Sequence, residues 1–278
     1  MKPDDLFVPL VLEQDVAGAN RGDVASALRL GYGYLTGSAG VIDLARARLN
    51  FGLAAPRSSA ASAWLGYLDA TLGSDPETNQ RGIGRLQQAV DLGDPVGQTL
   101  MGRIYEKGRG GCRKDRQAAA ALYTAASAEF ALAKTFLGQM LLGRGNFRDA
   151  IRLFKDASAA GEVGSMVSLA SLYLRERLKK PNIIGAKRLL RAAVARNDRV
   201  ALFRLGVIYR DGIGGSAPGA DHRAFNLFHR SARLGYRPAC TATARCYALG
   251  SGAPRSEKAA RFWWGRSAAR STGQAKLR

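Results

Sequence analysis

Two glycine- and arginine-rich stretches are the first candidates for chemistry in this sequence. Residues 100–111 read LMGRIYEKGRGG, and residues 204–215 read RLGVIYRDGIGG. A glycine-rich loop can hold phosphate when a strand precedes it and a helix N-terminus follows it. Both stretches instead follow residues at helical spacing, and the sequence contains no Gly-Lys-Ser/Thr step. We therefore predict that these loops are structural.

Histidines and cysteines are the next candidates for a reactive or metal-binding site. The only histidines are His222 and His229, seven residues apart and without other ligands at metal-binding spacing. We expect His222 at a helix start and His229 on a polar face. Cys112, Cys240 and Cys246 are spaced too irregularly for a disulfide framework. We expect Cys240 and Cys246 to pack between helices and Cys112 to be an exposed loop thiol. No metal, cofactor or catalytic residue is predicted, and the chain is not expected to be an enzyme.

The net charge of the chain indicates which classes of partner it could bind. The 278 residues include 42 Lys plus Arg against 22 Asp plus Glu, a formal charge of +20. Such a chain attracts acidic partners, namely nucleic acid, an anionic membrane or an acidic protein face. No stretch approaches the ~20 apolar residues of a membrane span. The opening MKPDDLFVPLVLEQD is too acidic and its apolar run too short for a signal peptide, so we expect a cytoplasmic protein.

An internal sequence repeat determines where these glycines, histidines, cysteines and basic residues lie. The two opening stretches align on Tyr105 and Tyr209, and further copies place the same anchor at positions 34, 69, 141, 173 and 247. Each anchor lies 32 to 38 residues after the previous one. The second half of five copies has an alanine, bulky residues three and four positions later and a small residue seven positions later. That spacing marks one face of a helix, so each repeat is predicted to be helix, glycine turn, helix.

Glycines and aspartates at fixed places in the repeat have predicted structural roles. Gly206 and its equivalents lie in mid-helix, where glycine costs ~1 kcal/mol relative to alanine, so we expect two helices to approach closely there. Gly108 and Gly212 follow the tyrosines at the helix end, where a left-handed residue is expected. Asp94 and Asp115 are expected to cap helix N-termini.

The pattern LG..Y..G.G followed by D...A..LY..A resembles the Sel-one-like repeat, a relative of the tetratricopeptide repeat. Full copies read MGRIYEKGRGGCRKDRQAAAALYTAA and LGVIYRDGIGGSAPGADHRAFNLFHRSA. The resemblance covers roughly residues 20–271. Asp69 takes the tyrosine position in one copy, the copy at 30–52 has a poor second helix, and the copy at 133–161 has a shortened loop.

The resemblance implies an all-α fold, a right-handed superhelical α-solenoid of about six to seven helix-turn-helix repeats of roughly 36 residues. We expect an N-terminal capping helix in residues 1–20, the solenoid in residues 21–271 and a polar basic tail in residues 272–278.

The resemblance also implies a scaffold or adaptor that binds other proteins. First helices line the concave side of such solenoids, so basic residues there would form a groove for an acidic protein partner. The residues predicted to contact this partner are Arg103, Lys107, Arg204, Arg210 and Arg245. Two alternatives remain open: nucleic-acid binding through phosphate contacts, and an immunity- or inhibitor-type partner of a toxin or enzyme.

Overall fold

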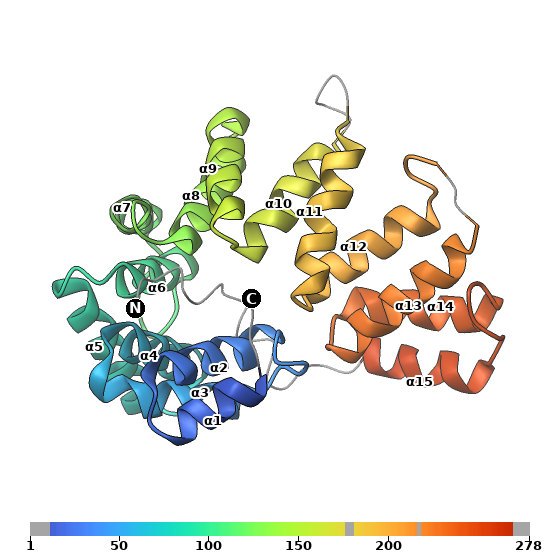
Figure 1. The fold of residues 1–278 in the computed structure, drawn as a ribbon. Coiled ribbons are helices and arrows are strands. Elements are labelled where there is room, and N and C mark those ends of the chain that lie inside the picture. The colour runs from blue at the N-terminus through green and yellow to red at the C-terminus, as the bar shows by residue number, and fades with distance from the viewer. Residues whose placement is uncertain (1–11, 176–180, 216–217, 269–278) are drawn as a thin grey trace. The chain divides into compact units, whose positions relative to one another are not determined.

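The computed structural model describes residues 12–175, 181–215 and 218–268, and in these ranges every regular element is a helix (Figure 1). The elements are α1 Leu12–Asn20, α2 Val24–Thr36, α3 Leu44–Ala54, the short 3-10 helix η2 Ala55–Arg57, α4 Ser59–Leu72, α5 Pro76–Asp91, α6 Pro95–Lys107, α7 Arg116–Ala126, α8 Ala131–Gly143, α9 Phe147–Ala159, α10 Val163–Tyr173, α11 Ile183–Ala195, α12 Arg199–Arg210, α13 Ala220–Arg233, α14 Arg237–Leu249 and α15 Glu257–Ala268.

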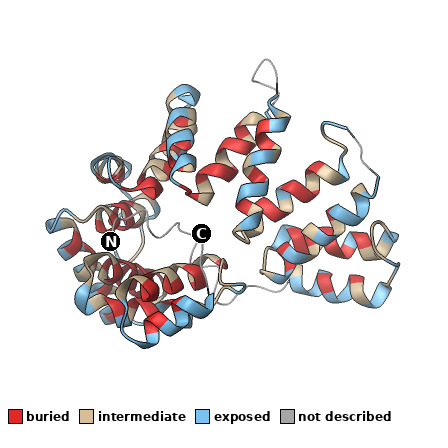
Figure 2. Ribbon diagram, viewed as in Figure 1, coloured by how far each residue is buried: buried red, intermediate tan, exposed pale blue. Residues whose placement is uncertain are grey.

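From α2 to α15 these helices follow the seven predicted helix pairs, which confirms the all-helical repeat fold. The described chain divides into two compact units. The N-terminal unit comprises residues 12–35 and 43–165, and the C-terminal unit comprises residues 36–42 and the described part of 166–268. Second helices such as α5 and α13 have a buried and an exposed face in Figure 2, as expected for amphipathic helices that pack on one side. The first helices α2, α4 and α10 have no exposed residue. The superhelical handedness stays a prediction.

Four of the mid-helix glycines lie under aromatic rings, and the fifth, Gly66, lies against the backbone of Gly82, which confirms the predicted close approach of the two helices in a repeat. A Cβ atom placed on any of four first-helix glycines would lie 2.6 to 2.8 Å from a ring carbon of the second helix. Each of these rings is fully buried. The glycine-ring pairs are Gly31 and Phe51, Gly102 and Tyr123, Gly138 and Phe154, and Gly206 and Phe228.

Two repeats have alanine in place of this glycine, and neither buries an aromatic ring at the usual second-helix position. Ala170 on α10 corresponds to Leu190 on α11, and both are fully buried. Ala244 on α14 corresponds to Trp264, which is 42% exposed, while Trp263 is buried instead. The bulky residue four positions after the second-helix alanine therefore leaves the core in this repeat. A methyl group occupies the space that the ring needs, so the ring leaves or a smaller side chain takes its place.

The second helix of the first repeat is better formed than the sequence pattern suggested. Ala47, Phe51 and Ala54 on α3 have exposures of 0 to 1%, with the spacing seen in the other second helices. The expectation of a poor second helix in residues 30–52 was wrong, because Phe51 packs on Gly31 of α2 as the other rings do.

Capping residues lie at both ends of the helices where the repeat predicts them. Asp94 accepts hydrogen bonds from the backbone N–H groups of two residues in α6, and Asp115 does the same for α7. Gly108 and Gly250 end α6 and α14 in the left-handed region, with φ of 64° and 72°, and Gly212 has φ of 63° just after α12. The predicted roles of the turn glycines and the two aspartates are confirmed.

Of the predicted 1–20 capping helix, the structure describes α1, which begins at Leu12. An ion pair of 2.6 Å joins buried Asp15 of α1 to Arg29 of α2. Residues 1–11 and the predicted basic tail, residues 272–278, lie outside the described residues. Among the described helices, none has the length and apolar character needed to cross a membrane.

Candidate functional site

Two of the predicted contact residues, Arg103 and Lys107 of α6, surround one carboxylate in the N-terminal unit. Glu106 pairs with Arg103 at 2.8 Å and with Lys107 at 3.0 Å. The hydroxyl of Tyr123 donates a third hydrogen bond to Glu106, at 2.9 Å. Burial acts to raise the pKa of Glu106, but the charge of Arg103 and these hydrogen bonds lower it on balance. Both cations are thus partly neutralised within the protein.

Arg103 and Arg245 occupy the same position of the repeat but have different surroundings. The guanidinium carbon of Arg103 lies 4.7 Å from the ring centroid of Phe136, which belongs to the first helix of the next repeat, and the Arg103 side chain is only 20% exposed. Arg245 lies on α14, in the last described helix pair, and is exposed. The next repeat therefore covers Arg103, whereas no following repeat in the described chain covers Arg245.

Arg204 and Arg210 both project from α12 in the C-terminal unit and are exposed. Arg210 donates two hydrogen bonds to neighbouring Asp211, of 2.7 and 3.1 Å, and these lower the pKa of that carboxyl. Among the described residues, no carboxylate lies within ion-pair distance of Arg204 or Arg245. These two arginines are therefore the most available cations of the predicted set. Whether all five residues contact a partner stays a prediction.

A cluster that the sequence pattern did not reveal surrounds Tyr209 in the C-terminal unit. The Tyr209 hydroxyl accepts a hydrogen bond of 3.3 Å from Arg191 of α11. The guanidinium carbon of Arg223 on α13 lies 6.0 Å from the Tyr209 ring centroid. The hydrogen bond from Arg191 and the charges of Arg191, Arg223 and Lys187 lower the pKa of Tyr209. Lys187 and Arg191, four residues apart on one helix face, were the available sequence signal.

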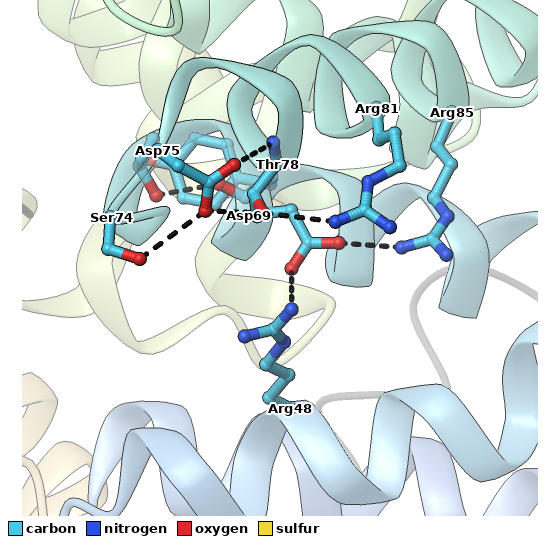
Figure 3. A network of polar contacts seen from close by, with 9 residues as sticks. Arg48, Asp69, Ser74, Asp75, Thr78, Arg81 and Arg85 are labelled. Atoms are coloured by element: carbon cyan, nitrogen blue, oxygen red, sulfur yellow. Dashed lines mark hydrogen bonds and ion pairs between the residues drawn. The ribbon is translucent and has the colours of Figure 1, made fainter.

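A second missed cluster replaces the repeat tyrosine by a carboxylate in the N-terminal unit. Asp69 of α4 is 4% exposed and pairs with Arg48 of α3 at 2.8 Å and Arg85 of α5 at 2.6 Å. Figure 3 shows the two guanidinium groups approaching this carboxylate from different helices, with Arg81 beside Arg85. An irregularity in the repeat thus forms a link between second helices of adjacent repeats.

The two histidines have separate roles. His222 lies in the first turn of α13, as predicted, and its Nδ1 is 3.0 Å from the carbonyl oxygen of Gly252. His229 was expected on a polar face, but its ring lies 5.6 Å from that of Phe225 and 5.4 Å from that of Trp263. That expectation was wrong, and burial lowers the pKa of His229. Phe225 of its own helix and Trp263 of the next repeat contact this half-buried ring, and the pattern of one helix does not show the second contact.

The three cysteines are the remaining candidates for a reactive or metal-binding group. Cys240 and Cys246 are buried packing residues, as predicted, and burial raises the pKa of both thiols. Cys112, expected to be exposed, is instead a half-buried residue of the loop before α7, because the loop folds partly over it, and burial raises its pKa. In the described ranges no three or more His, Cys, Asp or Glu side chains are grouped as metal ligands would be.

The repeat geometry agrees with a comparison to known families. The Sel1 repeat model matches residues 24–55, 95–129, 126–162, 199–236 and 237–271, which together span more than half of the chain. The chain belongs to the Sel1 repeat family. The matched segments of this Sel1 repeat protein include the α2–α3 pair. The α4–α5 and α10–α11 pairs lie outside the matched segments. They still form helix pairs, although Asp69 replaces the repeat tyrosine in the first and Ala170 replaces the mid-helix glycine in the second.

Solved structures share the Sel1 repeat fold. A Sel1 repeat protein from Oxalobacter formigenes has a TM-score of 0.64 and 19% identity, covering 94% of this chain and 97% of that one. The protective antigen c5321 of uropathogenic Escherichia coli has a TM-score of 0.51 and 23% identity, covering 96% of this chain but 66% of that one. The immunity protein Pa5087 of Pseudomonas aeruginosa has a TM-score of 0.55 and 18% identity, covering 75% and 80%. No curated protein matches the sequence.

Proposed function

We propose that this Sel1 repeat protein is a non-enzymatic adaptor that binds an acidic face of a partner protein through its basic surface. The observation that carries the proposal is the set of exposed cations on α11 to α14 of the C-terminal unit. Arg204 and Arg245 have no ion pair within the described chain, and further cations surround Tyr209. Because these charges are not neutralised internally, they are available to a carboxylate-rich surface.

The mechanism is electrostatic attraction followed by docking. A chain of net charge +20 draws an acidic partner toward it over distances near the Debye length, about 8 Å at physiological salt. Exposed ion pairs each contribute only about 0.2 to 1 kcal/mol, so several must act together. The charges therefore raise the association rate and the salt sensitivity more than the intrinsic affinity.

The test begins by capturing the partner from the source cell and identifying it by mass spectrometry. Binding of that partner is then measured by calorimetry and stopped-flow kinetics for the wild type and for Arg204→Glu/Arg245→Glu, at low and moderate salt. The double variant should fold normally, because both side chains are exposed. It should associate more slowly and depend less on salt. Arg144→Glu/Arg148→Glu, which reverses two exposed arginines of the other unit, is the control with the same change in net charge.

Other outcomes select the alternatives. Equal affinity of wild type and double variant would place the interface elsewhere on the protein. Binding of random-sequence DNA that survives physiological salt would favour the nucleic-acid function instead. A captured toxin or enzyme that loses its activity in the complex would make this protein an immunity- or inhibitor-type partner, and the structurally similar Pa5087 is an immunity protein.

A further inference from the structure

A pocket of about 550 Å³ lies within the N-terminal unit, between α3, α4 and α5. Its polar side is formed by Asp69 and the three arginines of Figure 3, Arg48, Arg81 and Arg85. Its other side is formed by α3, which contributes Ala45, Leu49, Gly52 and Leu53. None of these residues belongs to the set proposed above for the acidic partner surface.

The charges in this pocket do not balance. Asp69 is the one carboxylate among the lining residues, and it pairs with Arg48 and Arg85. Arg81 donates a hydrogen bond of 3.1 Å to the neutral hydroxyl of Thr78. The Thr78 hydroxyl in turn donates to Asp75, which lies outside the lining but interacts electrostatically with Arg81. Within the lining itself, three guanidinium groups surround a single negative charge. Each guanidinium carries five N–H donors, so donors remain for a second anion.

Asp69 also holds these donors in place. Its carboxylate is 4% exposed, whereas the side chains of Arg48 and Arg85 are 56% and 40% exposed. The buried anion thus anchors two otherwise mobile side chains at the pocket wall. Because the arginine side chains are already ordered, binding of a second carboxylate to them costs less side-chain entropy.

The apolar side of the pocket is unusually exposed. Leu49 and Leu53, one helical turn apart on α3, are 62% and 58% exposed. Between them lies Gly52, and a Cβ atom added there would meet no heavy atom within 4 Å. Two exposed leucines beside spare guanidinium groups suit a ligand that has an apolar side chain next to an anionic group.

We infer that the α3–α5 pocket binds a short acidic segment of a protein partner, in which a carboxylate lies next to a large apolar side chain. This inference rests on the proposed adaptor function and assigns it a second, peptide-binding site. A peptide fits better than nucleic acid, because the lining has leucines and no aromatic ring on which a base could stack. Guanidinium groups match the two oxygens of a carboxylate in bidentate hydrogen bonds.

The test uses a fluorescein-labelled, C-terminally amidated decapeptide of alternating glutamate and leucine, with fluorescence anisotropy as the readout. A glutamate–serine peptide tests the apolar contact, and a lysine–leucine peptide tests the charge. A serine–leucine peptide with a free C-terminus separates recognition of a terminal carboxylate from recognition of side-chain carboxylates. The wild type should bind the glutamate–leucine peptide more tightly than the serine-containing and lysine-containing probes.

Two variants address the pocket directly. Gly52→Leu places a side chain in the open space on α3 and should weaken binding by about tenfold or more. Arg81→Gln removes the guanidinium that has no carboxylate partner in the lining and should weaken binding by roughly two- to fivefold. The matched controls are Gly84→Leu, an exposed glycine of α5 with equally open surroundings, and Arg148→Gln on α9. Both controls should bind the peptide as the wild type does.

The outcomes separate this site from the surface of the C-terminal unit. Wild-type affinity in Gly52→Leu, or an equal loss in Arg148→Gln and Arg81→Gln, would overturn the pocket assignment. Loss of peptide binding in Arg204→Glu/Arg245→Glu with full binding in Gly52→Leu would also overturn it, yet would support the proposed function. Loss in Gly52→Leu alone supports the pocket, whatever the captured partner shows for the two C-terminal arginines.

Discussion

At the scale of single residues, one contact between a small residue and a ring recurs through the repeats. Gly206 lies against Phe228, and an added Cβ would be 2.6 Å from its ring. The ring is fully buried and cannot move aside. In the fifth repeat the corresponding residues are Ala170 and Leu190. At this position a glycine therefore faces a ring in four repeats, whereas the fifth repeat pairs an alanine with a leucine.

This pairing predicts a non-additive stability effect. Gly206→Ala should destabilise by about 1 to 3 kcal/mol through overpacking, although alanine favours helix. Phe228→Leu should cost about 1 kcal/mol through lost packing. The double variant recreates the pair found at Ala170 and Leu190, so it should cost clearly less than the sum. Urea denaturation of the four proteins measures this coupling as a double-mutant cycle.

Gly84→Ala is the control for helix propensity. Gly84 is an exposed residue of α5, and an added Cβ meets no heavy atom within 4 Å. This substitution should stabilise by up to about 1 kcal/mol. Strictly additive effects at Gly206 and Phe228 would show that the close contact does not limit the size of the ring.

At the scale of elements, a buried carboxylate links two first helices in the N-terminal unit. Glu162, just before α10, is 3% exposed and accepts a hydrogen bond of 2.5 Å from the hydroxyl of Thr135 on α8. It also accepts from the backbone N–H groups of Gly164 and Ser165, at 2.8 and 2.5 Å. No cation of the described chain lies within ion-pair distance. Burial therefore raises the pKa of Glu162.

The raised pKa predicts a pH-dependent stability. A carboxyl group whose pKa is higher in the folded than in the unfolded state stabilises the fold at low pH. This stabilisation is lost as pH rises from the ordinary glutamate value of 4.5 through the raised folded value, with a slope of at most about 1.4 kcal/mol per pH unit. Glu162→Gln should lack this dependence. The difference in unfolding free energy between variant and wild type should therefore shift in favour of the variant as pH rises.

Urea denaturation between pH 4 and pH 8 measures that difference. Glu129→Gln, at an exposed glutamate before α8, should follow the wild type across the whole range. Parallel curves for Glu162→Gln and wild type would contradict the prediction, and would mean that the three hydrogen-bond donors around Glu162 keep it ionised in the folded protein.

At the scale of the whole molecule, the repeat fold predicts that stability is lost one helix pair at a time. Helices contact mainly their own partner and the adjacent repeats, as with α12 to α15 in the C-terminal unit. A chain ending at Gly235 loses the complete α14–α15 pair. It should keep the ellipticity per residue of the remaining helices, because nearest-neighbour contacts support them. Far-ultraviolet circular dichroism and thermal melting provide the measurement, and complete loss of helicity would indicate a single cooperative globule.

A chain ending at Leu249 is the matched control, since it removes α15 but leaves α14. The cluster of Cys240, Ala244 and Trp263 would then lose its tryptophan and expose the apolar face of α14. This chain, although longer, should aggregate more and melt at a lower temperature than the chain ending at Gly235. The comparison tests whether the helix pair is the unit of stability.

Local and periodic features could be predicted from the sequence alone. The helix pairs, the left-handed Gly108 and Gly212 and the caps at Asp94 and Asp115 depend on residues within a few positions of one another. A repeat shows each such feature several times, so the pattern is evident without any structure. The basic partner residues could be chosen only by charge and helix position, which do not determine what covers a side chain.

Only the tertiary structure decided how residues of different repeats meet. Arg103 is covered by Phe136 of the next repeat, while Arg245 at the same repeat position is exposed. Asp69, an apparent defect in the repeat, joins arginines of two second helices. These contacts join residues 16 to 33 positions apart in sequence. Each depends on the size and charge of a neighbour in another helix, and helical periodicity carries no information about that neighbour.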